Sequence, residues 1–266
     1  MEHRQNLKLA TVLLVLAVLA SGCSHKPDKG DFIRTAQASY YSLSKNGITE
    51  LQCSVAPDWA AILRQEMKTE VKPDNAGLKL LNGVHFWVSV SETGKAKLTH
   101  QVDGYPQSMS GMDDLQKAIG GVEESVDGFW RTASVFLFTS ALPKPETTYQ
   151  LSEQDGSHLL SYRDGGYDIL TTIAKDYAIS EINASSATLS SSLKPKFTKT
   201  KAGFLLTAFD ADYKQGAGAP AHISVQVTYQ EVERFQLPSD LIIQTTSEGA
   251  PHDMRLHFAD YQIKRH

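Results

Sequence analysis

The chain has 266 residues, a formal net charge of -4 at pH 7 and 41% hydrophobic residues, which is typical of a globular protein. This charge gives no general attraction for nucleic acid or for anionic lipid head groups, so the composition excludes a protein that binds nucleic acid by charge alone. Two cysteines are too few for a disulfide framework, and the sequence predicts no metal site and no cofactor.

The amino terminus has the pattern of an export signal. Basic residues precede an apolar segment, residues 9–20, which is shorter than the roughly 20 residues that cross a bilayer. The small residues Ala20-Ser21-Gly22 then precede Cys23, which resembles the lipobox of bacterial lipoproteins, whose cysteine is acylated. We therefore expect residues 1–22 to be a lipoprotein signal peptide and Cys23 to be the lipid-attachment residue. The alternative is an ordinary secretory signal that leaves Cys23 as a free thiol.

A lipidated Cys23 would place the protein on a membrane. Each buried methylene of an acyl chain contributes about 0.8 kcal/mol, so two or three chains anchor it firmly. Residues 23–30 are polar, contain Pro27 and Gly30, and are predicted to be a tether. Ser24 stands where aspartate favours the inner membrane in some bacteria, so the resemblance implies the outer membrane, with the protein facing the periplasm. Residues 31–266 are expected to form one domain.

The first part of this domain mixes helical and strand patterns. Residues 31–44 and the segment after Asp58 have helical spacing and are predicted to be helices, with a strand around Cys53 between them. Cys53 alternates with apolar neighbours, so we expect a buried small hydrophobe rather than a nucleophile. Period-two alternation in residues 84–90 and 96–102 predicts a β-hairpin.

An apolar stripe over residues 112–136 then predicts a long helical segment that packs on a sheet, with Gly120-Gly121 expected to break or bend it. Beyond Pro143 the pattern is that of strands separated by short turns, which predicts an antiparallel meander. The serine-rich residues 185–193 are expected to form an exposed edge strand. The strand segments are 149–151, 159–162, 167–173, 177–182, 187–193, 204–209, 223–229, 241–245 and 254–263.

The carboxyl-terminal stretch resembles a known family. Residues 223–249, ISVQVTYQEVERFQLPSDLIIQTTSEG, contain a strand that ends in Tyr229, the pair Leu237-Pro238 and a turn at Gly249, and Tyr261 lies near the end of the last strand. Together with the order of elements, this resembles the outer-membrane lipoprotein-sorting superfamily, the LolA-like and LppX-like carriers. The resemblance implies a mainly β (α+β) fold: an incompletely closed, curved antiparallel sheet, or half-barrel, with helices packed in its concave mouth and an apolar cavity for acyl chains.

The candidate ligand-binding residues are inward-facing apolar side chains of the predicted sheet and long helix. Core packing is the alternative role for each of them, since any half-buried sheet has one apolar face. The candidates are Phe86, Val88, Leu98, Phe129, Trp130, Val225, Val227, Ile243 and Leu256.

The histidines predict structural roles rather than a metal site. His100 shares the apolar phase of the hairpin and is expected to be a hydrogen-bonded histidine at a strand end. His252 and His257 are five residues apart, which places them on opposite faces of a strand with no third ligand nearby.

Two functions fit these patterns. The first is a membrane-tethered periplasmic lipoprotein that binds a lipid or a lipoprotein acyl chain in an apolar cavity. The alternative is an envelope module or sensor that binds a protein partner and carries no lipid. The sequence has no G-x-S-x-G, H-E-x-x-H or phosphate-binding loop motif, so we do not expect an enzyme.

Overall fold

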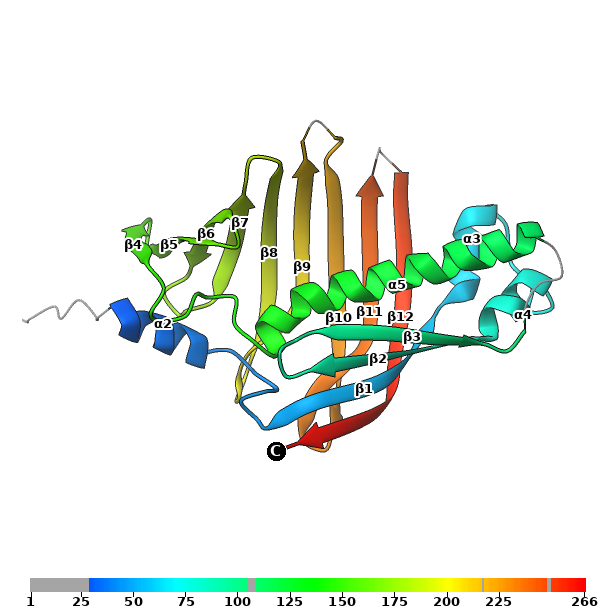
Figure 1. Ribbon diagram of the computed structural model, residues 1–266, viewed down its shortest axis with the longest axis horizontal. Helices are drawn as coiled ribbons and strands as arrows, with labels where there is room; N and C mark the ends of the chain where they lie inside the picture. Colours follow the sequence, from blue (N-terminus) through cyan, green and yellow to red (C-terminus); the bar gives the residue numbers. More distant parts are fainter. Residues whose placement is uncertain (1–28, 105–108, 217, 248–249) are drawn as a thin grey trace, which may run out of the picture.

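The computed structural model describes residues 29–104, 109–216, 218–247 and 250–266. The predicted signal peptide and Cys23 lie outside these residues. Helix α2 begins at Lys29, so its first two residues belong to the predicted tether. All described helices and strands belong to one arrangement, in which a single sheet carries helices on one face (Figure 1).

The protein is mostly β, with a 12-stranded antiparallel sheet that is not closed into a barrel, so the expected fold class is confirmed. The strand order is β3-β2-β1-β12-β11-β10-β9-β8-β7-β6-β5-β4. The strands are β1 (Ile48–Pro57), β2 (Val84–Ser91), β3 (Ala96–Val102), β4 (Tyr149–Gln154), β5 (Ser157–Asp164), β6 (Tyr167–Ile173), β7 (Ile179–Ser185), β8 (Leu189–Thr200), β9 (Gly203–Gln215), β10 (Ala221–Val232), β11 (Phe235–Ser247) and β12 (Ala250–Arg265).

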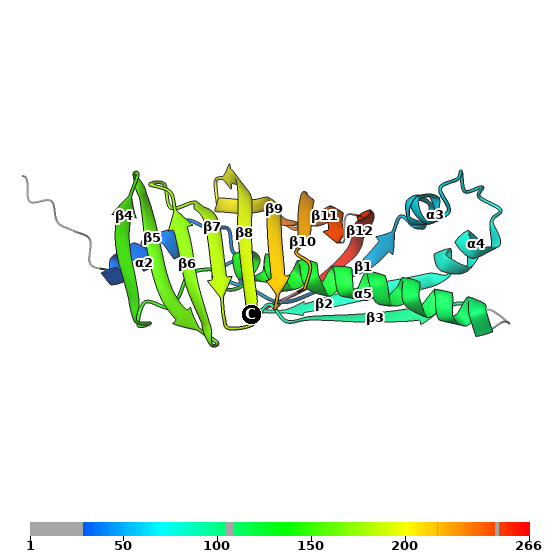
Figure 2. The same ribbon diagram turned by 90° about the horizontal axis from the view of Figure 1, so that it is seen from above.

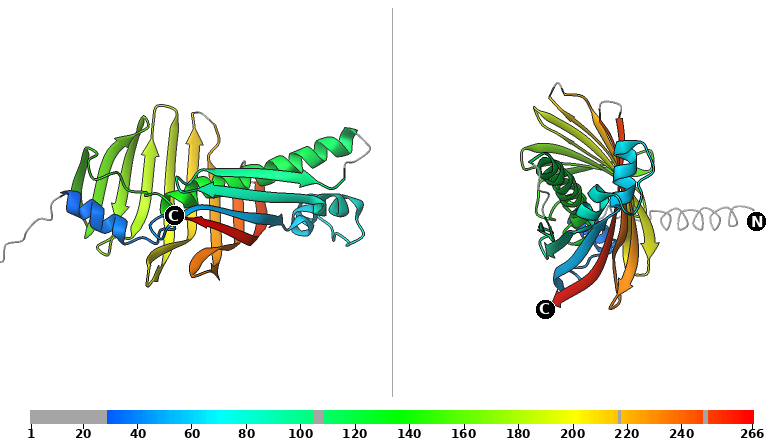
Figure 3. Two further views of the ribbon diagram at one scale, coloured as in Figure 1. Left: turned by 60° about the horizontal axis from the view of Figure 1, so that its bottom comes forward. Right: turned by 90° about the vertical axis from the view of Figure 1, so that its right-hand side faces the viewer.

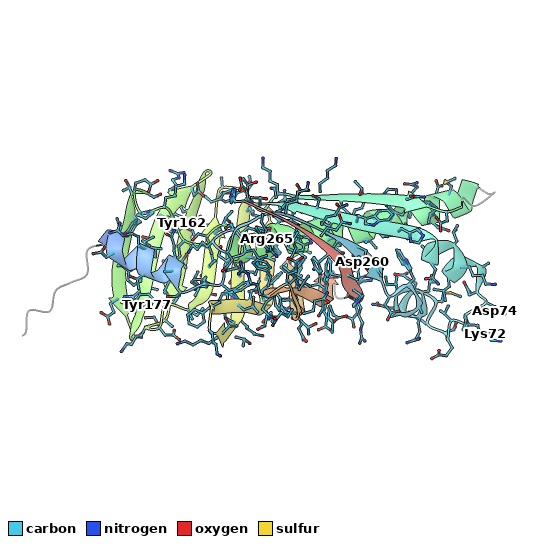
Figure 4. The ribbon with its side chains drawn as sticks, turned by 90° about the horizontal axis from the view of Figure 1, so that it is seen from below. Lys72, Asp74, Tyr162, Tyr177, Asp260 and Arg265 are labelled. Atoms are coloured by element: carbon cyan, nitrogen blue, oxygen red, sulfur yellow. The ribbon has the colours of Figure 1, made fainter. Side chains whose placement is uncertain are left out.

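The first and last strands of the chain pair with each other within the sheet. Strand β1 lies between β2 and β12, with Leu51 opposite Ile263, so the amino-terminal hairpin extends the carboxyl-terminal meander. A bulge interrupts this pair where Asp260 adopts a φ of 54° (Figure 4). Bulges increase local twist and bend the strand that carries them. The sheet thus curves around α5, which lies on its concave side (Figure 3, right).

Four helices complete the described fold: α2 (Lys29–Ala38), α3 (Trp59–Met67), α4 (Ala76–Asn82) and α5 (Met109–Leu137). Helix α3 begins at the predicted N-cap, since the Asp58 carboxylate accepts a hydrogen bond from the Ala61 amide at 3.0 Å. Helix α4 was not predicted. It is only 7 residues long, which is too short for a periodic pattern to stand out.

Two helix predictions were wrong in their extent. The first helix ends at Ala38 rather than near residue 44, because the chain turns there and the Tyr41 amide donates a hydrogen bond to the Phe204 carbonyl at 3.0 Å. Helix α5 continues through Gly120-Gly121 without a break for 29 residues. It crosses the strands obliquely along the longest axis of the molecule (Figures 1 and 2).

The strand predictions were right in number and order after Pro143, but one position was wrong. Residues 185–193 do not form a sheet edge, because β8 pairs with β7 on one side and with β9 on the other. The edges of the described sheet are β3 and β4. One serine of β8 has a polar partner on the neighbouring strand, because Ser192 Oγ donates a hydrogen bond to Glu181 Oε1 at 3.0 Å.

Candidate functional site

Helix α5 has two faces with different side chains. One face is apolar and fully buried; it comprises Val122, Val126, Trp130, Ala133 and Leu137, each with 0% exposure. These residues follow one another at steps of four and three, which keeps them on one side of the helix. Another face carries only small or polar side chains at the same steps: Gly121, Ser125, Gly128 and Thr132. The first face packs in the core and holds α5 in place. The second face is therefore not needed to hold the helix.

The small-residue face of α5 borders a cavity of about 370 Å³ above strands β9 to β12. Helix α5 supplies Gly121, Glu124, Ser125, Gly128, Phe129 and Thr132, and the sheet supplies Phe209, Tyr213, Ile223, Val225, Ile243, Thr245 and Met254. A volume of this size lies within the range of about 300–1,000 Å³ that is common for small-molecule sites.

Strand register gathers the floor of the cavity from four strands. Val225 of β10 lies opposite Phe209 of β9 and opposite Ile243 of β11, and Ile243 lies opposite Met254 of β12. Directly opposed residues have their side chains on the same face, about 4.5–5.5 Å apart at Cβ. The four strands therefore present one continuous apolar surface to the helix.

The floor of the cavity is more exposed at one end than at the other. Phe209, Val225 and Ile243 are buried beneath α5. Tyr213 and Ile223, which lie farther along β9 and β10 toward the turn that joins them, are only half-buried. The exposed fraction thus rises toward the β9–β10 turn, which places the mouth of the cavity at that end of the strands.

Two glycines keep the helix side of the cavity empty. A Cβ atom added to Gly121 or to Gly128 would meet no atom within 4 Å outside the helix itself. Close packing therefore does not require glycine at either position. Glycine in a helix interior costs about 0.8–1.0 kcal/mol relative to alanine. The helix thus carries two unfavourable residues where larger side chains would project into the open volume.

Three of the nine candidate ligand-binding residues line this cavity: Phe129, Val225 and Ile243. The other six lie elsewhere in the core. Phe86, Val88, Trp130, Val227 and Leu256 are buried, and Leu98 is half-buried against the same cluster. Trp130 packs edge-on against Phe129 and Phe258, with ring centroids 5.2 and 6.1 Å apart.

Sequence reasoning missed most of the residues that define the cavity. It did not single out Gly121, Ser125, Gly128, Phe209, Tyr213, Ile223 or Met254 as site residues. The available signal was the recurrence of small residues at Gly121, Ser125, Gly128 and Thr132, which marks a helix face with little to pack.

Polar groups in the cavity are few. Ser125 Oγ donates to the Gly121 carbonyl at 2.8 Å, so this hydroxyl is used within the helix. Burial raises the pKa of the Tyr213 hydroxyl, while the nearby Arg131 guanidinium lowers it. Among the described residues of the lining, Glu124 is the only charged one. The surroundings therefore suit an apolar ligand with a small polar end.

Three reactive or titratable residues outside the cavity, Cys53, His100 and His257, are buried or hydrogen-bonded. Cys53 is buried, as expected, and burial raises the pKa of its thiol to about 12. The predicted hydrogen bond of His100 is confirmed: its Nδ1 lies 3.0 Å from Glu123 Oε1. His257 Nδ1 lies 2.9 Å from Asp240 Oδ1. Within the described part of the chain, no three histidine, cysteine or acidic side chains cluster in a way that could hold a metal ion.

Comparisons of the chain with protein-family models, with curated proteins and with solved structures give no match. The resemblance to the lipoprotein-sorting superfamily therefore stays a prediction. None of the helices in the described residues combines the length and apolar composition needed to cross a bilayer. What is established is a class of architecture: an open, curved antiparallel sheet with one long helix on its concave side.

Proposed function

We propose that this protein binds the apolar tail of a lipid or of a similar amphiphile in the cavity between α5 and strands β9 to β12. The observation that carries the proposal is the cavity itself: about 370 Å³ of space with an apolar floor from four strands and a mouth at one end. A tail would lie on Phe209, Val225 and Ile243, and its polar end would remain near Tyr213 at the mouth. Burial of apolar surface would supply most of the binding energy.

The glycines of α5 support this proposal. Gly121 and Gly128 have room for larger side chains, and each lowers helix stability by about 1 kcal/mol. A protein without cargo would gain stability by filling this volume. A protein that binds a tail needs the volume free, and glycine provides it at these two positions in the cavity lining.

The amino-terminal sequence also suggests where the protein is located. A lipidated Cys23 would tether the domain to a membrane, with the outer membrane and the periplasm as the expected place. A tethered cavity would receive or hold cargo near that membrane instead of carrying it freely between compartments. Labelling cells with an acyl precursor would test the anchor, because Cys23→Ser should abolish incorporation.

The cavity is tested by what co-purifies with the folded domain. Every helix and strand that the structure describes lies within residues 29–266, so the chain from residue 24 onward contains the whole described fold. We expect mass spectrometry of solvent extracts from this purified chain to find lipid. We also expect it to take up the uncharged fluorescent probe N-phenyl-1-naphthylamine, which brightens in apolar surroundings.

Two neighbouring glycines give a matched pair of variants. Gly121→Leu should fill the cavity and abolish probe uptake, whereas Gly120→Leu should leave it intact. Gly120 is exposed and lies outside the cavity lining, and its added side chain also meets no atom within 4 Å. Equal uptake by both variants would refute the site. If the wild-type chain binds neither lipid nor probe, the function as a lipid binder fails and a protein-binding module becomes the better hypothesis.

A further inference from the structure

We infer that the cavity selects amphiphiles by the charge of their head group: it accepts uncharged and cationic heads and discriminates against anionic ones. This inference rests on the proposed function, because it concerns the same cavity. It concerns the mouth rather than the apolar floor, and it assigns the discrimination to Glu124 and to the pairing of Asp127 with Arg131.

The lining of the cavity carries one formal charge, and that charge is negative. Among the lining residues that the structure describes, Glu124 is the only acidic one, and none is lysine, arginine or histidine. Glu124 is exposed, and no lysine or arginine of the described chain forms an ion pair with it. A head group at the mouth would therefore meet a carboxylate without a compensating cation.

The Arg131 cation lies near the mouth, but it is already paired. Arg131 is close enough to Tyr213 to act on its hydroxyl electrostatically. Its guanidinium forms an ion pair with the Asp127 carboxylate one helical turn earlier. The pair is neutral as a whole, which leaves Glu124 as the uncompensated charge among the described lining residues. An anionic head group would have to compete with Asp127 for Arg131 while it is repelled by Glu124.

The mouth also offers a hydrogen-bonding group for an uncharged head. The Tyr213 side chain lines the cavity, and its hydroxyl makes no hydrogen bond with another described residue. A phenolic hydroxyl both donates and accepts, so it can bind an ester carbonyl or an alcohol. A glycerol ester can therefore form a hydrogen bond with the Tyr213 hydroxyl, and a quaternary ammonium is attracted by the Glu124 carboxylate. A free carboxylate is repelled by Glu124.

The test compares three ligands that share one alkyl chain length and differ in head-group charge: dodecanoate, dodecanoyl glycerol and dodecyltrimethylammonium. Each is titrated below its micelle concentration against the bound naphthylamine probe at about pH 8, where a carboxylic acid is ionised. Two like charges at short range near a protein surface repel each other, and this repulsion is absent for an uncharged head group. We expect dodecanoate to bind at least about tenfold more weakly than the other two compounds.

Variants of α5 separate the local effect from net charge. Glu124→Gln removes the repulsion, and Asp127→Asn releases Arg131, so each should strengthen dodecanoate binding several-fold and weaken or leave unchanged the binding of the cationic ligand. Asp114→Asn makes the same change in net charge at an exposed position of the same helix outside the cavity lining, and it should have no effect.

The outcomes of these titrations distinguish charge selection from lipid binding itself. If all three ligands displace the probe equally from the wild-type chain, or if Asp114→Asn acts as strongly as Glu124→Gln, the charge selection is refuted while the lipid-binding function stands. If the wild-type chain does not take up the probe and binds none of the three ligands, the proposed function itself fails.

Discussion

The glycines of α5 allow a quantitative test of how the helix is held. Gly120, Gly121 and Gly128 all lie in the helix interior, and an added Cβ meets no atom within 4 Å outside the helix at any of them. Alanine is favoured over glycine by about 0.8–1.0 kcal/mol per helical position, partly because it restricts the unfolded chain. Replacing all three by alanine should therefore raise the free energy of unfolding by about 2–3 kcal/mol. For a domain of this size, that corresponds to a rise in Tm of roughly 5–10 °C.

Thermal and urea unfolding of the chain from residue 24 would measure this change. Two other glycines serve as controls of opposite sign, because their φ angles are +77° at Gly94 and +115° at Gly203. A Cβ would lie 2.6 Å from Ser134 Cβ at Gly94 and 2.6 Å from the Ser39 carbonyl oxygen at Gly203, so alanine at either position should be destabilising. A triple α5 variant that is less stable than the wild type would refute the reasoning, since it would mean that the glycines are needed for close packing.

Two further predictions concern single side chains. Cys53 is 1% exposed with a pKa raised to about 12 by burial, so a thiol reagent at neutral pH should label the chain from residue 24 only after unfolding; rapid labelling of the folded protein would contradict its burial. The hydrogen bond from His257 lowers the pKa of Asp240, so its stabilising contribution is present above the unfolded pKa near 3.9 and is lost as the pH falls through the lower folded value. Asp240→Asn should therefore lower the free energy of unfolding at neutral pH, with a deficit that shrinks below about pH 4; a deficit that is constant with pH would argue against this cause.

The sheet was predictable because its pairing is local. After Pro143 each strand pairs with its neighbours in sequence, from β4 with β5 through β11 with β12, so alternation and turn residues were sufficient to place them. The error at residues 185–193 came from composition: serine is common at exposed edges, but the position of a strand in a sheet is set by its partners. The error at Gly120-Gly121 has a different cause: the low helix propensity of glycine is outweighed by the packing of its neighbours. The penalty of about 1 kcal/mol per glycine is smaller than the energy from burying Val122, Val126 and Trp130 on the next turns.

The candidate site was only partly predictable. Periodicity indicates on which face of a helix or strand a side chain lies, but not whether that side chain reaches the cavity. Val225 and Val227 point to the same face of β10, yet only Val225 reaches the cavity, since two residues along a strand are separated by about 6.6 Å. Phe129 and Trp130 are consecutive on a helix and therefore point about 100° apart. The first lines the cavity and the second is fully buried between helix and sheet.

A cavity forms where side chains are too small to fill the space, whereas a hydrophobic pattern in the sequence shows only where large apolar side chains are. On α5 the two kinds of information lie side by side: the buried face from Val122 to Leu137 fixes where the helix sits, and Gly121 and Gly128 determine how much volume remains beside it. Substitutions on the first face change packing and stability, because they remove contacts with a dense core. Substitutions at the two glycines change the volume while the other face still holds the helix in place. The capacity of the cavity can thus vary independently of the fold, and probe uptake by the Gly121→Leu variant measures that independence directly.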